Sequence, residues 1–220
     1  IEFTGPLHFM RFWLDCIREW EAENGKDLYV MLSATKDVQD AILLDPRYRT
    51  LVDIIDIRQW SYNQDGSIFE PRGGVNLAPR QYSRIDTTAQ SGPDAIGRQV
   101  RDYRTAYPDI AVVSNAGRVK GGNWIAFVSG GSMCDIPKIT IPSFLKDVLM
   151  MKPLDSLTVE GIQWGMGDPT VGYVIYTTET EVKLGPAANR KSYRIRWIDP
   201  TTGKIIRKPL EGGAVAYITK

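Results

Sequence analysis

The stretch that decides the fold is Val52-Asp53-Ile54-Ile55-Asp56-Ile57, followed directly by Arg58-Gln59-Trp60-Ser61-Tyr62-Asn63. A short β-branched run bounded by polar residues is typical of a buried strand in a parallel sheet. The loop after it extends to about Arg84, well beyond the ~2–6 residues usual after a strand in an α/β unit. Loops of that length are commonly functional, so the sequence predicts that this one forms the wall of a binding cleft.

The side chains of this loop suit a polyhydroxylated ligand. The CH faces of a sugar pack on aromatic rings, which is the role we predict for Trp60 and Tyr62; the alternative is that both rings pack under the loop as core. Sugar hydroxyls need planar hydrogen-bond donors, which Arg58 and Arg80 offer. Glu70 adds a carboxylate to the same loop.

Composition excludes several classes of function. The 220 residues include 27 basic and 26 acidic side chains, with a net charge of +1, so no overall field favours nucleic acid or an acidic membrane. The two cysteines and the single His8 form no metal-binding pattern. No apolar run reaches the ~20 residues that a membrane-spanning helix needs. We therefore expect no metal, no organic cofactor and no membrane span.

The first part of the chain alternates helices with buried strands. Apolar residues spaced by three and four predict a helix over residues 6–24, closed by Asn24-Gly25. Residues 121–136 fit a helix or a strand, and we favour a helix followed by a short strand around Met133–Ile136. Alternating strands and helices with strands that are apolar on both faces predict a parallel sheet wrapped by helices. The remaining predicted helices are residues 36–44, about 92–107 and 143–151, and the remaining predicted strands are residues 27–33, 52–57 and 109–114.

The pattern changes after Pro153. Four strands are predicted at residues 157–164, 171–178, 192–198 and 214–218, with a turn at Asp199–Lys204. This pattern indicates a small antiparallel β-sandwich. We therefore predict two domains, residues 1–153 and 154–220, in contact through Trp164 and its neighbours, with a mainly structural role for the second.

Several motifs in this order resemble a large superfamily of barrel glycosidases. The chain resembles the second half of a TIM-barrel glycoside hydrolase joined to a C-terminal, collagen-binding-like β-sandwich, as in polysaccharide-degrading enzymes of Bacteroidota. The resemblance implies an α/β plus all-β fold: half of a (β/α) barrel followed by the sandwich. The motifs that carry it are Glu2-Phe3-Thr4-Gly5-Pro6, Trp13-Leu14-Asp15, the end of the Asp53–Trp60 strand, Gly73-Gly74-Val75-Asn76-Leu77-Ala78-Pro79-Arg80-Gln81, Gly130-Gly131-Ser132, Gly172-Tyr173-Val174-Ile175-Tyr176 and Trp197-Ile198-Asp199-Pro200-Thr201-Thr202-Gly203.

The resemblance implies a role for Glu2 as the acid/base carboxyl group, although the superfamily usually has Asn before it and this chain has Ile1. The superfamily places a nucleophilic Glu at the end of the seventh strand, where this chain has Ser114-Asn115-Ala116. Glycoside hydrolysis needs two carboxyl groups that face each other across the scissile bond. Asp56, Glu70 or Asp135 are candidates for the second group, and so is a residue upstream of the chain.

Three residues, Asp56, Asn115 and Asp135, have further expected roles. An unpaired charge at Asp56 is costly inside an apolar strand, so Asp56 is expected either to pair with an Arg or to face the mouth of the barrel. Asn115 is expected to bind ligand or loop backbone at the rim, and Asp135 to contribute to substrate binding. The alternative, favoured by the missing Glu at the end of the seventh strand, is a non-catalytic carbohydrate-binding or structural module.

The predicted partners follow from this interpretation. The ligand is an oligo- or polysaccharide of plant or microbial origin, and the protein is expected to be secreted, periplasmic or at the cell surface, with any signal outside the visible chain. Half a barrel leaves strand edges unpaired. We therefore expect the chain to need the missing N-terminal barrel half or a second copy of itself.

Overall fold

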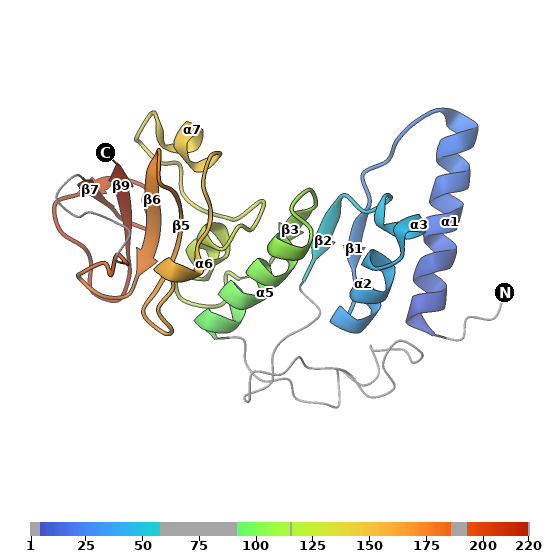
Figure 1. Cartoon of the computed structure of the whole chain (residues 1–220), viewed down its shortest axis with the longest axis horizontal. Helices are drawn as coiled ribbons and strands as arrows, with labels where there is room; N and C mark the ends of the chain where they lie inside the picture. Colours follow the sequence, from blue (N-terminus) through green and yellow to red (C-terminus); the bar gives the residue numbers. More distant parts are fainter. Residues whose placement is uncertain (1–4, 58–91, 115, 186–192, 220) are drawn as a thin grey trace. The chain divides into compact units, whose positions relative to one another are not determined.

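A computed structural model describes residues 5–57, 92–114, 116–185 and 193–219 (Figure 1). These residues fall into two compact units. Unit 1 comprises residues 5–57 and 106–113, and unit 2 comprises residues 92–105, 114, 116–185 and 193–219. The predicted domain boundary at residues 153 and 154 lies within unit 2, and it stays a prediction.

Unit 1 contains a parallel sheet of three strands, β1 (Met31–Ser33), β2 (Ile54–Asp56) and β3 (Ala111–Val113), in the order β1-β2-β3. Leu32 lies opposite Ile55 and Ile55 opposite Val112. Ile55 and Val112 are fully buried, as expected of β-branched residues in a central strand. The predicted parallel sheet is therefore confirmed for these three strands.

Three helices accompany this sheet. The predicted helix over residues 6–24 is confirmed as α1 (Pro6–Asn24), which ends where Gly25 adopts a left-handed φ of 60°. The next predicted helix is α2 (Lys36–Leu43). It is followed by α3 (Pro46–Arg49), which was not predicted. Pro46 starts α3 because Asp45 precedes it as an N-cap and accepts a hydrogen bond from the Arg47 N–H.

Helices of unit 2 match the predictions in part. α5 (Pro93–Ala106) and α6 (Gly122–Val128) lie where helices were expected, and α7 (Phe144–Val148) is shorter than expected. The strand predicted around Met133–Ile136 is wrong, since this segment joins no sheet. Met133 has a φ of 53°, outside the range of a strand, and Pro137 lacks the N–H that a ladder requires.

The second sheet of the molecule has six antiparallel strands in the order β4-β5-β6-β9-β7-β8. The predicted strand at residues 157–164 begins only at Gln163, because the 3-10 turn Asp155–Leu157 and a tight turn occupy the residues before it. Since β9 pairs with both β6 and β7, the described strands form one sheet, where a sandwich has two. The strands are β4 (Lys152–Pro153), β5 (Gln163–Asp168), β6 (Gly172–Thr177), β7 (Arg194–Ile198), β8 (Ile205–Ile206) and β9 (Ala214–Thr219).

Both faces of this sheet are covered, which explains why every residue of β6 is buried. On one face Tyr173 and Ile175 pack with Leu157 and Val182. On the other face Trp164 and Tyr176 lie side by side with ring centroids 6.2 Å apart. A Cβ on Gly97 of α5 would lie 2.9 Å from Cδ1 of Trp164, so the glycine permits close contact between α5 and this face.

The predicted turn at Asp199–Lys204 is confirmed. The Asp199 N–H donates to the Lys204 carbonyl at 2.9 Å, and Gly203 completes the turn with a φ of 69°. The Thr201 N–H donates to the Asp199 carboxylate at 2.8 Å, which lowers the pKa of Asp199. No helix within the described ranges is long and apolar enough to cross a lipid bilayer.

Candidate functional site

Of the predicted site residues, Asp56 lies among the described residues of unit 1. It is the last residue of β2, in register between Ser33 of β1 and Val113 of β3, and it is fully buried. The buried Gln39 side chain donates from Nε2 to the carbonyls of Leu32 at 3.1 Å and Asp56 at 2.7 Å. Gln39 thus holds α2 against the carboxyl ends of β1 and β2, where α/β folds place their active sites.

Most of the other predicted site residues lie outside the described ranges. They are Glu2, Arg58, Trp60, Tyr62, Glu70, Arg80 and Asn115. Their predicted roles stay predictions. Asp135 is described, and it belongs to unit 2 rather than to the unit that contains Asp56.

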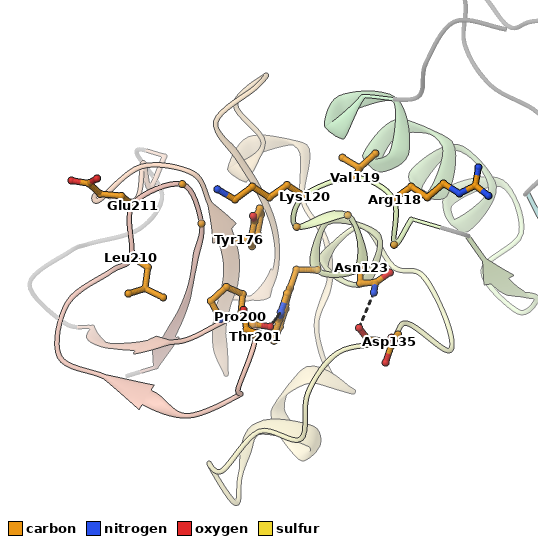
Figure 2. Close-up of a pocket in the computed structure, with 16 residues that line it drawn as sticks. Arg118, Val119, Lys120, Asn123, Asp135, Tyr176, Pro200, Thr201, Leu210 and Glu211 are labelled. Carbon is orange, nitrogen blue, oxygen red and sulfur yellow. Dashed lines mark hydrogen bonds between the residues drawn. The ribbon is translucent and has the colours of Figure 1, made fainter. Parts of the chain in front are cut away.

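Unit 2 contains a cavity of about 570 Å³, shown in Figure 2, and Asp135 is one of its lining residues. The cavity lies among the loop before α6, strand β6 and the two turns that flank β8. We call it the unit 2 pocket. Its lining residues are Gly117, Arg118, Val119, Lys120, Gly121, Gly122, Asn123, Trp124, Asp135, Tyr176, Pro200, Thr201, Leu210, Glu211, Gly212 and Gly213.

Glycines shape the loop before α6. The Val119 N–H donates to the Ala116 carbonyl at 3.1 Å, and the Gly122 N–H donates to the Val119 carbonyl at 2.8 Å. Gly121 has a φ of 72°, and a Cβ on Gly122 would overlap the Ala116 carbonyl oxygen. Only glycine fits both positions without strain.

Tyr176 forms the inner end of the pocket. Strand β6 carries it, and its side chain is only 2% exposed. A Cβ on Gly121 would overlap the Tyr176 hydroxyl, and a Cβ on Gly213 would lie 2.6 Å from it, so the hydroxyl sits between two glycine turns. A tyrosine is protonated at neutral pH, and burial raises the pKa of Tyr176 further. Within the described part of the chain, this hydroxyl has no hydrogen-bond partner.

The charged residues around the pocket balance one another. Arg118 and Lys120 line the pocket together with Asp135 and Glu211, and none of the four forms an ion pair with another described residue. Asp135 and Glu211 lie on opposite sides of the pocket in Figure 2. These two carboxylates therefore do not form the facing pair that glycoside hydrolysis uses.

Two hydrogen bonds hold the wall of the pocket. Asn123 donates from Nδ2 to the Asp135 carbonyl at 2.9 Å, and Trp124 donates from Nε1 to the Pro200 carbonyl at 2.8 Å. They attach α6 to the segment around Asp135 and to the turn after β7. Among the described residues, no group of three or more His, Cys, Asp or Glu side chains is placed to hold a metal ion.

Of the pocket residues, sequence reasoning named Asp135, whose role stays a prediction, and did not name Tyr176, Lys120 or Glu211. A signal was present, because Lys120-Gly121-Gly122 and Glu211-Gly212-Gly213 are both a charged residue followed by two glycines. Tyr176 carried no such signal. It was predicted only as a strand residue.

Comparison with known proteins gives one family and one solved structure. A family model described as a domain of unknown function, DUF6298, matches residues 1–151. The chain is similar, at 8% identity and a TM-score of 0.41, to the glycoside hydrolase family 30 subfamily 8 xylanase Xyn30A from Clostridium acetobutylicum. That match covers 94% of this chain and 60% of the xylanase chain, so the chain spans less than two thirds of that relative. A search of curated proteins found no match.

Proposed function

This chain belongs to the DUF6298 family, and we propose that it is a carbohydrate-active protein of the glycoside hydrolase type. Its substrate would be a plant or microbial polysaccharide, cleaved by general acid/base chemistry of carboxyl groups without a metal or organic cofactor. The observation that carries the proposal is the fully buried carboxyl group of Asp56 at the carboxyl end of β2.

The position of Asp56 supports a chemical role. It lies at the carboxyl end of a parallel strand, where α/β enzymes gather their catalytic groups. The residues directly after this strand include Arg58, Trp60 and Tyr62, which suit a sugar ligand. Glu2 and Glu70 are the proposed sources of the second carboxyl group.

We propose that unit 1 is part of a (β/α) barrel. Its strands are parallel and follow one another in chain order, as barrel strands do. A polysaccharide substrate also favours a secreted, periplasmic or cell-surface location.

The enzyme proposal is tested by measuring release of reducing ends from a panel of plant and microbial polysaccharides. We expect release by the unaltered chain and a loss of about 10²–10⁴-fold for Asp56→Asn, the range that a positioned acid or base supplies. Asp53→Asn is the matched control, because Asp53 precedes the same strand, is exposed, and accepts from the Val30 N–H through an oxygen that Asn retains. Glu2→Gln tests the proposed second group.

Two outcomes would reject the enzyme proposal: no release from any polysaccharide of the panel, or full activity in Asp56→Asn. Thermal unfolding of each variant separates a lost catalytic group from a lost fold. If the chain binds polysaccharide without release, the second candidate function applies.

That second candidate is a non-catalytic carbohydrate-binding protein. The unit 2 pocket favours it, because its two carboxylates lie on opposite sides and its inner hydroxyl has no hydrogen-bond partner within the described residues. Such a pocket is built to hold hydroxyl groups rather than to place an acid opposite a nucleophile.

A further inference from the structure

We infer that the unit 2 pocket binds one neutral, polyhydroxylated ring of a ligand, with the Tyr176 hydroxyl as its innermost polar contact. This site belongs to unit 2 alone, and its lining residues do not include Glu2, Asp56 or Glu70, the carboxyl groups named in the proposed function. That the polyhydroxylated ligand is a saccharide rests on the proposed function.

The first argument is the state of the Tyr176 hydroxyl. Its side chain is 98% buried, it lines the pocket, and it has no hydrogen-bond partner within the described residues. Because no described residue bonds to this hydroxyl at the pocket wall, it is left to bond to water or to a ligand hydroxyl, which offers one bond as acceptor or donor. A phenol hydroxyl does both, as a sugar hydroxyl does.

The second argument is the close approach of backbone to side chain that glycines allow at the pocket wall. Gly121, Gly212 and Gly213 have φ values of 72°, 74° and 155°, a region that other residues rarely adopt. A Cβ on Gly121 or Gly213 would contact the Tyr176 hydroxyl, and a Cβ on Gly212 would lie 2.5 Å from Nζ of Lys120. Glycine at positions 121 and 213 therefore lets the backbone pack directly against the Tyr176 hydroxyl, and glycine at position 212 lets Lys120 Nζ lie against the same turn.

The third argument is the balance of charge, which selects a neutral ligand over an anion. Arg118 and Lys120 are offset by Asp135 and Glu211 among the lining residues. An anion site would present donors alone, whereas this pocket presents donors and acceptors together, which is what hydroxyl groups require. Its volume of about 570 Å³ lies within the range of ligand pockets.

The experiment is a binding titration of the full chain by calorimetry. Neutral probes are xylotriose, cellotriose and mannotriose, and anionic probes are glucuronate and inorganic sulfate. We expect a neutral probe to bind, and Tyr176→Phe to weaken this binding about two- to tenfold, the effect of one hydrogen bond. Lys120→Met, which changes an exposed side chain of the rim, is expected to weaken the same probe.

Controls separate the pocket from the rest of the molecule. Lys208→Met makes the same change at an exposed lysine outside the lining residues and is expected to leave binding unchanged. Tyr176→Phe should leave the melting temperature unchanged or raise it, because the hydroxyl it removes has no partner among the described residues. If Tyr176 were purely structural, Tyr176→Phe would not weaken probe binding while leaving the melting temperature unchanged.

Three results would overturn the inference. The unaltered chain binds none of the neutral probes, or it binds only the anionic probes, or Tyr176→Phe and Lys120→Met both bind a neutral probe as well as the unaltered chain does. Absence of polysaccharide cleavage would reject the enzyme proposal and leave this inference standing. Conversely, cleavage lost in Asp56→Asn with no effect of Tyr176→Phe on probe binding would support the enzyme and reject the pocket.

Discussion

Replacement of Gly97 by alanine sets helix propensity against packing at the contact between α5 and Trp164. Alanine is favoured over glycine within a helix by about 1 kcal/mol. Against this, the new Cβ would lie 2.9 Å from Cδ1 and 3.2 Å from Nε1 of Trp164, closer than ordinary van der Waals contact. The sign of the effect depends on whether Trp164 is able to move.

The surroundings of Trp164 prevent that movement. Its side chain is fully buried, and its ring lies beside Tyr176 of the neighbouring strand. Nη1 of Arg101 would also lie 3.1 Å from the new Cβ, but a guanidinium at the end of a flexible side chain moves at little cost. Overpacking of a filled core typically costs about 1–3 kcal/mol. We therefore expect Gly97→Ala to lower the free energy of unfolding by about 1 kcal/mol after the helix gain is subtracted.

The assay is thermal unfolding of the full chain, in which about 1 kcal/mol corresponds to a shift of about 2–4 °C for a protein of this size. Thr105→Ala is the matched control, because it improves propensity at an exposed position of the same helix. A double-mutant cycle with Trp164→Phe measures the coupling directly. If Gly97→Ala raised the melting temperature as Thr105→Ala is expected to do, the packing argument would be refuted.

Two further predictions concern a thiol and a strand edge. Burial raises the pKa of Cys134 to about 11, so its thiol stays protonated at pH 8. Because the thiolate is the reactive form, we expect iodoacetamide to alkylate Cys134 more slowly in the folded than in the unfolded protein at this pH. The alkylation rate of the folded protein should rise toward pH 11. Mass spectrometry of the modified peptide measures this, and equal rates at pH 8 would contradict it. The chain is also expected to self-associate. The outer edge of β1 pairs with no strand in the described ranges, and the apolar side chains at and before this strand are exposed: Leu28 by 44%, Tyr29 by 91% and Met31 by 45%. Size-exclusion chromatography with light scattering tests this, and a monomer with a cooperative thermal transition would show it to be wrong.

The parts of the fold that the sequence predicted best are those governed by local signals. The bounds of α1 follow from Pro6 at its start, apolar residues spaced by three and four, and Gly25 after its end. β2 follows equally from its β-branched run.

The errors arose where distant contacts decide the structure. The strand predicted at residues 157–164 looked regular, but the buried Gln163 side chain donates to the carbonyls of Leu157 at 2.7 Å and Lys183 at 2.8 Å. These bonds draw the preceding residues into a turn, and the strand starts only at Gln163 itself. The strand propensity of residues 157–164 carries no information about a hydrogen bond to a residue twenty positions away.

The same limit applies to the unit 2 pocket. Asp135 was a candidate because it lies in the strand predicted around Met133–Ile136; that strand is wrong, Asp135 lines the pocket, and its role stays a prediction. Tyr176 becomes a pocket residue only because Gly121 and Gly213 meet its hydroxyl, and these glycines are far apart in sequence. The sequence pattern therefore does not show that Gly121 and Gly213 both lie against the Tyr176 hydroxyl.

The position of β9 between β6 and β7 has a consequence for how unit 2 folds. During synthesis β9 leaves the ribosome after β4 to β8, yet it pairs with β6 from Gly172 opposite Thr219 to Thr177 opposite Ala214, and with β7 on its other side. The sheet is therefore unable to assemble hairpin by hairpin, and both β6 and β7 keep an unpaired edge until β9 arrives. Such long-range pairing slows folding and lengthens the time for which aggregation competes with it. A chaperone that shields strand edges would help this unit most in that interval.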